Sequence, residues 1–242
     1  MSKSVIIIPA RLAATRLPNK PLIKINDKSL IMHVYEKAMK SDLGDVYVAT
    51  CDKEIAEEVS KNGGKFIMTS SKHLSGTDRV YEAGKKLNLQ NIDYVINVQG
   101  DEPMINPEDI RNLNTTSKIN NFDFSTLASN FKNKDDYTNK NIVKVFTNNK
   151  ISNSIFSTAR NFSRKIINNN HNVYHHYGVY IYKFSILERF VKLKQSVNEK
   201  NESLEQLRAL DNNIDVHVIL AKHFSVGIDT KQDIDNYMKL IN

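Results

Sequence analysis

The chain has one cysteine, no long apolar run and no concentrated stretch of basic residues. Because Cys51 stands alone, an internal disulfide is impossible, and a reducing compartment fits. No apolar run approaches the roughly 20 residues that a bilayer-spanning helix needs. Pro9 and Arg11 interrupt the N-terminal apolar segment, which argues against a secretory leader. We therefore expect a cytoplasmic protein with no stable membrane association.

The net charge of +7 is spread along the chain. Scattered basic residues favour an anionic small substrate, or a role in solubility alone. A nucleic-acid-binding protein would be expected to concentrate its basic residues in a stripe. The length of 242 residues suits one large α/β domain, or one domain with an appendage, and an apolar fraction of 40% is ordinary for a globular protein.

The first twenty residues join a β-branched run to a basic loop. Val5 to Ile8 predict a strand buried on both faces, as in a parallel sheet. We expect Pro9 to stop the ladder, and Pro18 and Pro21 to keep the next loop out of a helix. This loop carries three cations that follow the carboxyl end of the strand, where open α/β sheets bind ligands: Arg11, Arg16 and Lys20. Solvated surface charge is the alternative, but the position favours phosphate.

The hydrophobic pattern alternates strand and helix in the first half of the chain, which is typical of a parallel sheet with crossover helices. Helices are predicted over 29–40, 52–60, 78–87, 107–119, 184–192 and from 199 to 208, with a last helix capped by Thr230. Strands are predicted over 45–50, 65–68, 94–98, 122–129, 139–147, 151–156, 177–182 and 214–220. The alternation stops after about residue 121, which favours an antiparallel insertion there.

Two later loops carry polar groups at the ends of predicted elements. Ser75, Gly76 and Thr77 open a helix, where backbone N–H groups are able to bind an anion or a polar base edge, although an ordinary N-cap is an equal alternative. Asp101 and Glu102 follow the strand over 94–98. A carboxylate there suits Mg²⁺, which takes one or two carboxylates together with phosphates and water. The alternative is a turn-forming Asp.

Two further clusters have simple structural explanations. His171, His175 and His176 lack the spacing and the cysteines of a zinc site, so a plain strand is favoured. Glu202, Glu205 and Gln206 fall within one helical turn and are able to share a face, which by itself most often means a solvated acidic surface.

Several stretches together resemble one family. Pro9-Ala-Arg-x-x-x-Thr-Arg-Leu-Pro-x-Lys-Pro-Leu22, His73-x-Ser-Gly-Thr-Asp-Arg79, Asn97-Val-Gln-Gly-Asp-Glu-Pro103, His176-x-Gly-x-Tyr180, Glu202-x-x-Glu-Gln-Leu-Arg208 and Ile228-Asp-Thr-x-x-Asp233 occur in the family's order. The chain is similar in these to the 3-deoxy-manno-octulosonate (Kdo) cytidylyltransferases. The resemblance implies transfer of CMP from CTP to Kdo, with release of pyrophosphate, Mg²⁺ as cofactor, and a homodimer that serves lipopolysaccharide synthesis.

The resemblance also implies an architecture. The expected fold is α/β, a Rossmann-like mostly parallel sheet with flanking helices and a smaller antiparallel lobe for sugar binding and dimerisation. One cytidylyltransferase domain would comprise a nucleotide-binding half over 1–120, a sugar-binding and dimerisation part over about 121–225, and a metal-ligand loop and helix over 226–242.

By the same resemblance each site residue takes a role. Asp101 and Asp229 are the expected metal ligands and, with Arg11 and Lys20, the expected catalytic residues. The residues expected to bind CTP are Arg11, Arg16, Lys20, Ser75, Gly76, Thr77, Arg79 and Gln99. The residues expected to bind the sugar acid are Gln99, Arg160, His176, Tyr180, Glu202, Glu205 and Gln206.

The sequence departs from the family pattern at one point. Thr158 stands where the family has an arginine expected to meet the sugar carboxylate, and Asn161-Phe-Ser-Arg164 replaces the usual Ile-Pro segment. Arg160 or Arg164 would then substitute from a shifted position. Two alternatives stay open: a cytidylyltransferase for another sugar acid, such as 8-amino-Kdo or a sialic acid, and a basic module that binds nucleotide or RNA without chemistry.

Overall fold

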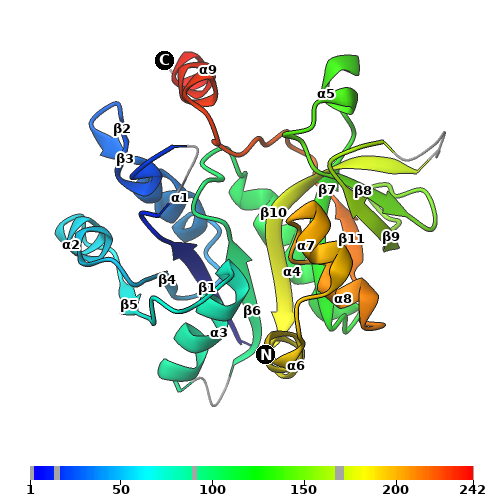
Figure 1. The fold of residues 1–242 in the computed structure, drawn as a ribbon, viewed down its shortest axis with the longest axis horizontal. Helices are drawn as coiled ribbons and strands as arrows, with labels where there is room; N and C mark the ends of the chain where they lie inside the picture. Colours follow the sequence, from blue (N-terminus) through cyan, green and yellow to red (C-terminus); the bar gives the residue numbers. More distant parts are fainter. Residues whose placement is uncertain (1–2, 14–16, 89–91, 167–171, 242) are drawn as a thin grey trace. The chain divides into compact units, whose positions relative to one another are not determined.

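The computed structural model describes residues 3–13, 17–88, 92–166 and 172–241, which form two compact units (Figure 1). The first unit comprises Met1–Arg111 and Ser225–Asn242, and the second comprises Asn112–Phe224. Helix α4 (Pro107–Ile119) includes the point at which the chain passes from one to the other. Among the described residues, no helix combines the length and the apolarity needed to cross a membrane.

The first unit contains a parallel run of strands in the order β5-β4-β1-β6. Its strands are β1 (Lys3–Ala10), β4 (Val46–Thr50), β5 (Phe66–Met68) and β6 (Ile92–Val98). In β1 the side chains of Ile6, Ile7 and Ile8 are fully buried. Both faces of the strand are therefore covered, as the β-branched run predicts.

The expectation that Pro9 ends the strand is wrong, because β1 continues through Pro9 and Ala10. Pairing with β6 ends at Ile7, whereas pairing with β4 continues past Pro9 to Ala10. Beyond the last pair with β6, the Pro9 carbonyl faces Gly100. In any other residue the N–H at this position would point to the same side as the carbonyl, where β6 no longer offers a partner. The missing N–H of Pro9 therefore removes no hydrogen bond from the sheet.

The helices of the first unit largely match the predicted ranges. They are α1 (Leu30–Met39), α2 (Lys53–Lys61), α3 (Gly76–Lys86) and α9 (Lys231–Ile241). α1 and α2 pack on β4, and α3 packs across β1 and β4. The loop that was expected to avoid helix forms one short 3₁₀ turn, η1 (Lys20–Leu22), because Pro21 fits the first turn of a helix.

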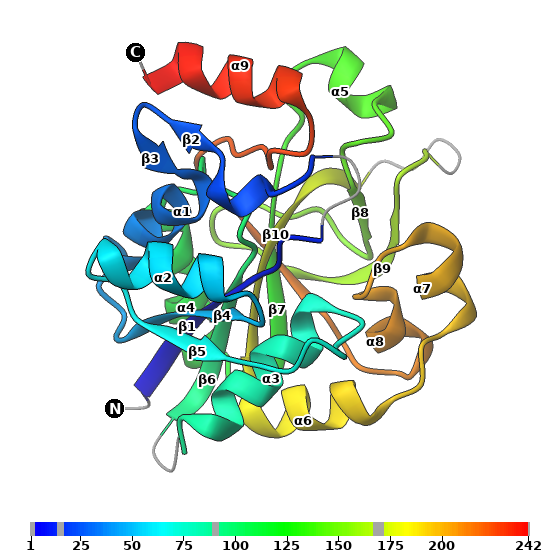
Figure 2. The same cartoon turned by 60° about the vertical axis from the view of Figure 1, so that its left-hand side comes forward.

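A small hairpin of β2 (Lys24–Ile25) and β3 (Lys28–Ser29) gives the C-terminal helix its packing surface. Ile25 of β2 shares a buried cluster with Ile228, Ile234 and Tyr237, and α9 lies beside the hairpin (Figure 2). The end of the chain is thereby fixed to the segment that follows η1.

The strands of the second unit follow the order β10-β7-β11-β9-β8, and β10 also pairs with β8. They are β7 (Phe124–Ser129), β8 (Lys144–Thr147), β9 (Ser157–Ser163), β10 (Val173–Lys183) and β11 (His217–Leu220). All of these pairs are antiparallel except β7 with β11. The expected antiparallel insertion is present, and its pairings form a closed circuit. This unit also contains the helices α5 (Lys134–Thr138) and α6 (Phe184–Lys192).

The predicted strands over 139–147 and 151–156 are wrong in their bounds. Asn139 accepts a hydrogen bond from the Asn141 amide through its side chain, 2.9 Å, and a turn therefore delays β8 until Lys144. Ser152 and Ile155 exchange backbone hydrogen bonds and close a second tight turn. The β-branched and aromatic residues of 151–156 therefore lie in that turn, and β9 begins only at Ser157.

The single helix expected from 199 is two helices, α7 (Val197–Glu202) and α8 (Leu207–Asp211). Ser203 breaks the pattern with φ of 54°, in the left-handed region that ends helices. The break turns the chain so that Glu199 forms a two-point ion pair with Arg208, with bonds of 2.8 and 2.5 Å. Glu202, Glu205 and Gln206 consequently do not share a helix face.

We expect the Glu199–Arg208 ion pair to stabilise this region, because both side chains are buried. Glu199→Gln removes the charge that compensates Arg208, and breaking such a pair costs about 3–5 kcal/mol of unfolding free energy. Urea unfolding of the full chain measures this loss. The exposed Glu57→Gln substitution in α2 is the control, with an expected change below about 0.5 kcal/mol. Equal effects of both substitutions would contradict the role of the ion pair.

Candidate functional site

The loop after β1 brings Lys20 back to the ends of other segments. Arg11 is exposed directly after the strand, and the Leu12 amide donates a 2.8 Å hydrogen bond to Asp52 at the start of α2. Arg16 lies outside the described residues. Asn19 adopts a left-handed conformation just before Lys20, and this sharp change of direction positions the Lys20 side chain.

The Lys20 ammonium contacts both predicted metal ligands. Its Nζ lies 2.7 Å from Asp101 Oδ2 and 3.0 Å from Asp229 Oδ1, and it also donates to the Ile228 carbonyl at 2.9 Å. The expected meeting of Asp101 and Asp229 is thus present in this structure. Sequence reasoning assigned Lys20 to phosphate and missed its contact with the carboxylates, because no local pattern links positions 81 and 209 residues apart.

Main-chain and side-chain bonds hold the two carboxylates together. The Ile228 amide donates to the Asp101 carbonyl at 2.8 Å, directly beside Asp229. The Ser225 hydroxyl donates to the buried Glu102 carboxylate at 3.1 Å. Glu102, the residue next to Asp101, thus anchors the segment that carries Asp229. The Thr230 hydroxyl accepts from the Asp233 amide at 3.2 Å and so caps α9 as predicted, while the Asp233 carboxylate accepts from the Thr230 amide and hydroxyl. The Asp229 carboxylate is not needed as the cap and bonds to Lys20.

The electrostatics of this cluster are those of a cation shared between two anions. Burial, the largest single influence, lowers the pKa of Lys20, but the attraction and hydrogen bonds of Asp101 and Asp229 outweigh it, so the pKa is raised. The carboxylate side chains are 34% and 29% exposed, against 14% for Lys20. Solvent and substrate oxygens therefore have access to the carboxylates.

The chemistry of the cluster fits a hard divalent cation. Within the described part of the chain, no group of three or more His, Cys, Asp or Glu side chains forms a metal cage. A carboxylate pair suffices for Mg²⁺, which usually takes its remaining ligands from phosphates and water. Protein Zn²⁺ sites usually include His or Cys ligands, which this cluster does not offer.

The loop before α3 lies next to the end of β6. A Cβ added at Gly76 would stand 3.4 Å from the Pro9 ring and 3.5 Å from Gln99 Oε1. The end of β1, the start of α3 and Gln99 therefore adjoin one another. Asn97 accepts a 3.2 Å hydrogen bond from the Gln99 amide nitrogen and so orients that side chain. The Ser75 hydroxyl accepts from the Asp78 amide at 3.2 Å, so it caps the helix, which begins two residues earlier than predicted.

Arg79, expected at CTP, is buried inside the first unit. Its guanidinium donates to the Thr69 hydroxyl and, at 3.3 Å, to the Ser70 carbonyl. These bonds hold the chain that leads into the loop before α3. A direct contact between Arg79 and nucleotide stays a prediction.

In the second unit His176 is a buried neutral imidazole. Burial, and secondly the proximity of His175, lowers its pKa to about 3. The Thr126 hydroxyl donates to the Val179 carbonyl at 2.8 Å and lies 3.0 Å from His176 Nε2. Since a hydroxyl has one proton to donate, we infer that Nε2 donates to Thr126 and that Nδ1 is an acceptor. Tyr180 lies beside this ring, with the ring centroids 5.5 Å apart.

The remaining predicted sugar-binding residues occupy several environments of the second unit. Glu202 accepts from the Ser163 hydroxyl and the Arg164 amide, both at 3.2 Å. Gln206 is 4% exposed, and its amide nitrogen has no hydrogen-bond partner among the described residues. Glu205 is half-buried and Arg160 is exposed on β9. The hydroxyl of Thr158 accepts from Asn148 at 2.8 Å.

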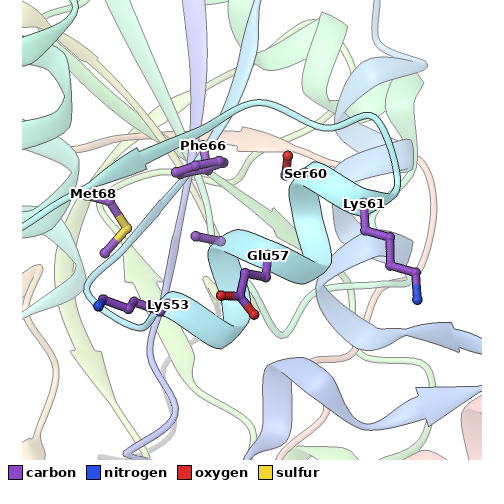
Figure 3. A pocket seen from close by; sticks show the side chains of 7 residues that line it. Lys53, Glu57, Ser60, Lys61, Phe66 and Met68 are labelled. Atoms are coloured by element: carbon purple, nitrogen blue, oxygen red, sulfur yellow. The ribbon is translucent and has the colours of Figure 1, made fainter.

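A separate groove of about 560 Å³ lies between α2 and β5 in the first unit (Figure 3). Its lining side chains come from this helix and strand: Lys53, Ala56, Glu57, Ser60, Lys61, Phe66 and Met68. It contains none of the predicted site residues, so the groove is distinct from the Lys20 cluster.

We expect substitutions of Lys20 and Asp229 to have coupled effects on the free energy of unfolding. Lys20→Met leaves two carboxylates without their shared cation, and we expect a loss of about 1–3 kcal/mol in unfolding free energy with EDTA present. The loss should shrink in an Asp229→Asn background, with a coupling of at least about 0.5 kcal/mol. Because the pKa of Lys20 is raised, this stabilisation is full below the unfolded value of about 10.4 and fades as the pH rises through the folded value. Additive losses in urea unfolding would disprove the coupling.

Comparison with known proteins gives one consistent result. The family described as cytidylyltransferase matches residues 5–217. The 3-deoxy-manno-octulosonate cytidylyltransferase of Thermodesulfovibrio yellowstonii is 45% identical, over 99% of this chain and 98% of its own. The enzyme of the same name from Paramagnetospirillum magneticum is 38% identical, over 98% and 97%.

Solved structures agree with the sequence matches. A CMP:2-keto-3-deoxy-manno-octonic acid synthetase in complex with CTP has a TM-score of 0.87 and 35% identity, over 99% of this chain and 98% of its own. A UTP-bound UGPase from Acinetobacter baumannii, 12% identical with a TM-score of 0.70, shares the fold alone. The mixed α/β fold is therefore of the nucleotidyltransferase type. The motifs, the fold and full-length identity together show that this chain belongs to the 3-deoxy-manno-octulosonate cytidylyltransferase family.

Proposed function

We propose that the chain transfers CMP from CTP to Kdo, with Asp101 and Asp229 as the ligands of a catalytic Mg²⁺. In this proposal the first unit binds CTP and the metal, and the second unit supplies groups for the sugar acid and for a homodimer. The observation that carries the proposal is the convergence of both carboxylates on Lys20 at 2.7 and 3.0 Å, from segments far apart in sequence. Full-length identity of 38–45% to enzymes of this name supports the choice of substrates.

The reaction is a displacement at the α-phosphorus of CTP, in which one P–O bond forms and another breaks. The anomeric hydroxyl of Kdo attacks the α-phosphorus of CTP. The bond from the α-phosphorus to the bridging oxygen breaks, and pyrophosphate leaves with the electron pair of that bond. The hydroxyl proton passes to solvent. Such a displacement depends on alignment and charge neutralisation more than on covalent help from the protein.

The first unit's own groups perform that alignment. Arg11 and Arg16 are assigned to the β- and γ-phosphates, where arginine forks suit phosphate oxygens. Lys20, expected to join them there, also holds Asp101 and Asp229 in place. Ser75, Gly76, Thr77 and Gln99 are assigned to the nucleotide. When bound, Mg²⁺ supplies Lewis-acid neutralisation of phosphate charge and lowers the pKa of a coordinated hydroxyl.

The second unit offers polar groups suited to a sugar acid. His176 is buried and neutral, and the side-chain nitrogen of Gln206 is buried without a hydrogen-bond partner among the described residues. A buried polar group without a partner gains most when a ligand hydroxyl satisfies it. Tyr180, Glu202 and Glu205 are assigned to the same task. Arg160 or Arg164 is assigned to the sugar carboxylate, because Thr158 bonds to Asn148 and carries no charge.

An activity toward 8-amino-Kdo is the second candidate, and the neutral Thr158 is the observation that favours it. A sialic acid is disfavoured, since both relatives named above are Kdo enzymes. Binding of nucleotide or RNA without chemistry is disfavoured as well, since the full-length relatives named above are cytidylyltransferases.

The metal assignment predicts a loss of turnover in Asp101→Asn. This substitution removes one ligand charge at nearly constant size, and kcat should fall at least ~100-fold at saturating Mg²⁺. The exposed Asp93→Asn, at the other end of β6, is the matched control and should keep wild-type turnover. Near-normal turnover of the Asp101 variant would reject the assignment.

The choice of sugar acid predicts the outcome of a substrate panel. Pyrophosphate release is measured with Mg²⁺ and CTP, in parallel with Kdo, 8-amino-Kdo and N-acetylneuraminate. We expect release with Kdo. Release only with 8-amino-Kdo would place the change of specificity in the second unit, and no release with any acid would reject the proposed reaction.

A further inference from the structure

Glu82 connects α3 to the loop that precedes it. The loop begins at Thr69, directly after β5, and ends at Ser75, where α3 begins. The Glu82 carboxylate accepts a hydrogen bond from the Ser70 amide at 2.9 Å and another from the His73 ring. Its other oxygen pairs with Lys86 at 2.8 Å. One side chain of the helix thus holds the loop near its start and at its middle.

The Glu82 carboxylate is negatively charged near neutral pH. Burial, the largest single influence, raises its pKa, but the hydrogen bonds from Lys86, the Ser70 amide and His73 together outweigh it and lower the pKa to about 2. The carboxylate therefore holds the loop as an anion, and hydrogen bonds to a charged group are the stronger kind.

Arg79 gives the loop a second attachment on the same side of α3. Residues three apart lie next to each other on a helix surface, and Arg79 bonds to Thr69 and Ser70 while Glu82 bonds to Ser70 and His73. The loop is therefore tied to its own helix by two opposite charges. By contrast, the Leu74 side chain between His73 and Ser75 is 72% exposed, so little apolar packing holds it.

The loop leads directly into the start of α3, beside the ends of β1 and β6. Only Leu74 separates His73, which Glu82 holds, from Ser75 and Gly76, and Gly76 lies against Pro9 and Gln99. We propose that Glu82 is a positioning residue for CTP: it fixes the Ser70–His73 segment so that Ser75, Gly76 and Thr77 meet the nucleotide. This inference rests on the proposed function, in which those three residues bind CTP.

Glu82→Gln tests the proposal. Glutamine keeps an oxygen for the Ser70 amide but loses the charge and one acceptor, so the loop should loosen without loss of the fold. We expect the KM for CTP and the Kd for CTP, measured by calorimetry without sugar acid, to rise about tenfold. The kcat at saturating CTP and the KM for Kdo should stay within about twofold.

Two controls separate positioning from general stability. Lys86→Met removes the third partner of Glu82 but leaves its bonds to Ser70 and His73, and the Kd for CTP should change less than twofold. Glu57→Gln, on the exposed side of α2, should change nothing. The inference is overturned if Lys86→Met matches Glu82→Gln, or if Glu82→Gln lowers kcat and both KM values alike.

Ser75→Ala separates failure of this inference from failure of the proposed function. If Ser75→Ala weakens CTP binding and Glu82→Gln does not, the role of Glu82 alone is rejected. If neither variant changes CTP binding, the assignment of this loop to the nucleotide fails, and the positioning role fails with it.

Discussion

The attraction between the Lys20 ammonium and the carboxylates of Asp101 and Asp229 is the constraint on which the first unit's candidate site depends. Two anions would otherwise repel one another where three separate segments meet. The main-chain bond from the Ile228 amide to the Asp101 carbonyl and the bond from the Ser225 hydroxyl to the Glu102 carboxylate fix the same meeting point independently of Lys20. The chain's own groups therefore fix the positions of the carboxylates, and such preorganisation reduces the reorganisation that a reaction requires.

The same physical device recurs at two other places. Glu82 ties a loop to α3, and Glu199 with Arg208 joins α7 to α8 across a break. In each case a charged side chain holds an irregular segment of backbone in place, because such a segment makes few apolar contacts of its own. The regular elements hold the chain together through burial, as the fully buried β1 residues illustrate. Charge then decides where the connecting segments lie.

The sequence predicted the regular elements well, because β1, α1, α4 and α6 carry strong local patterns. It failed where a local turn overrides propensity, as at Asn139, Ser152 and Ser203. The motifs pointed to Asp101 and Asp229 as candidates, but the strand-end rule supports only Asp101, which follows β6, because β11 ends at Leu220, well before Asp229. The contacts of Lys20, Glu82 and Arg79 were not predictable, because they depend on distances between segments that no spacing in the sequence encodes.

The position of β5 at the end of its sheet order has a consequence for solubility. A strand with one open side is able to pair with a strand of another molecule and so begin aggregation. β5 has only three residues, and Lys86 donates a 2.8 Å hydrogen bond to the Met68 carbonyl on that strand. The lysine thereby occupies a backbone acceptor and brings a charge that an incoming strand would have to desolvate. Short length and one cation together protect this edge, although Phe66 and Met68 are partly exposed on it.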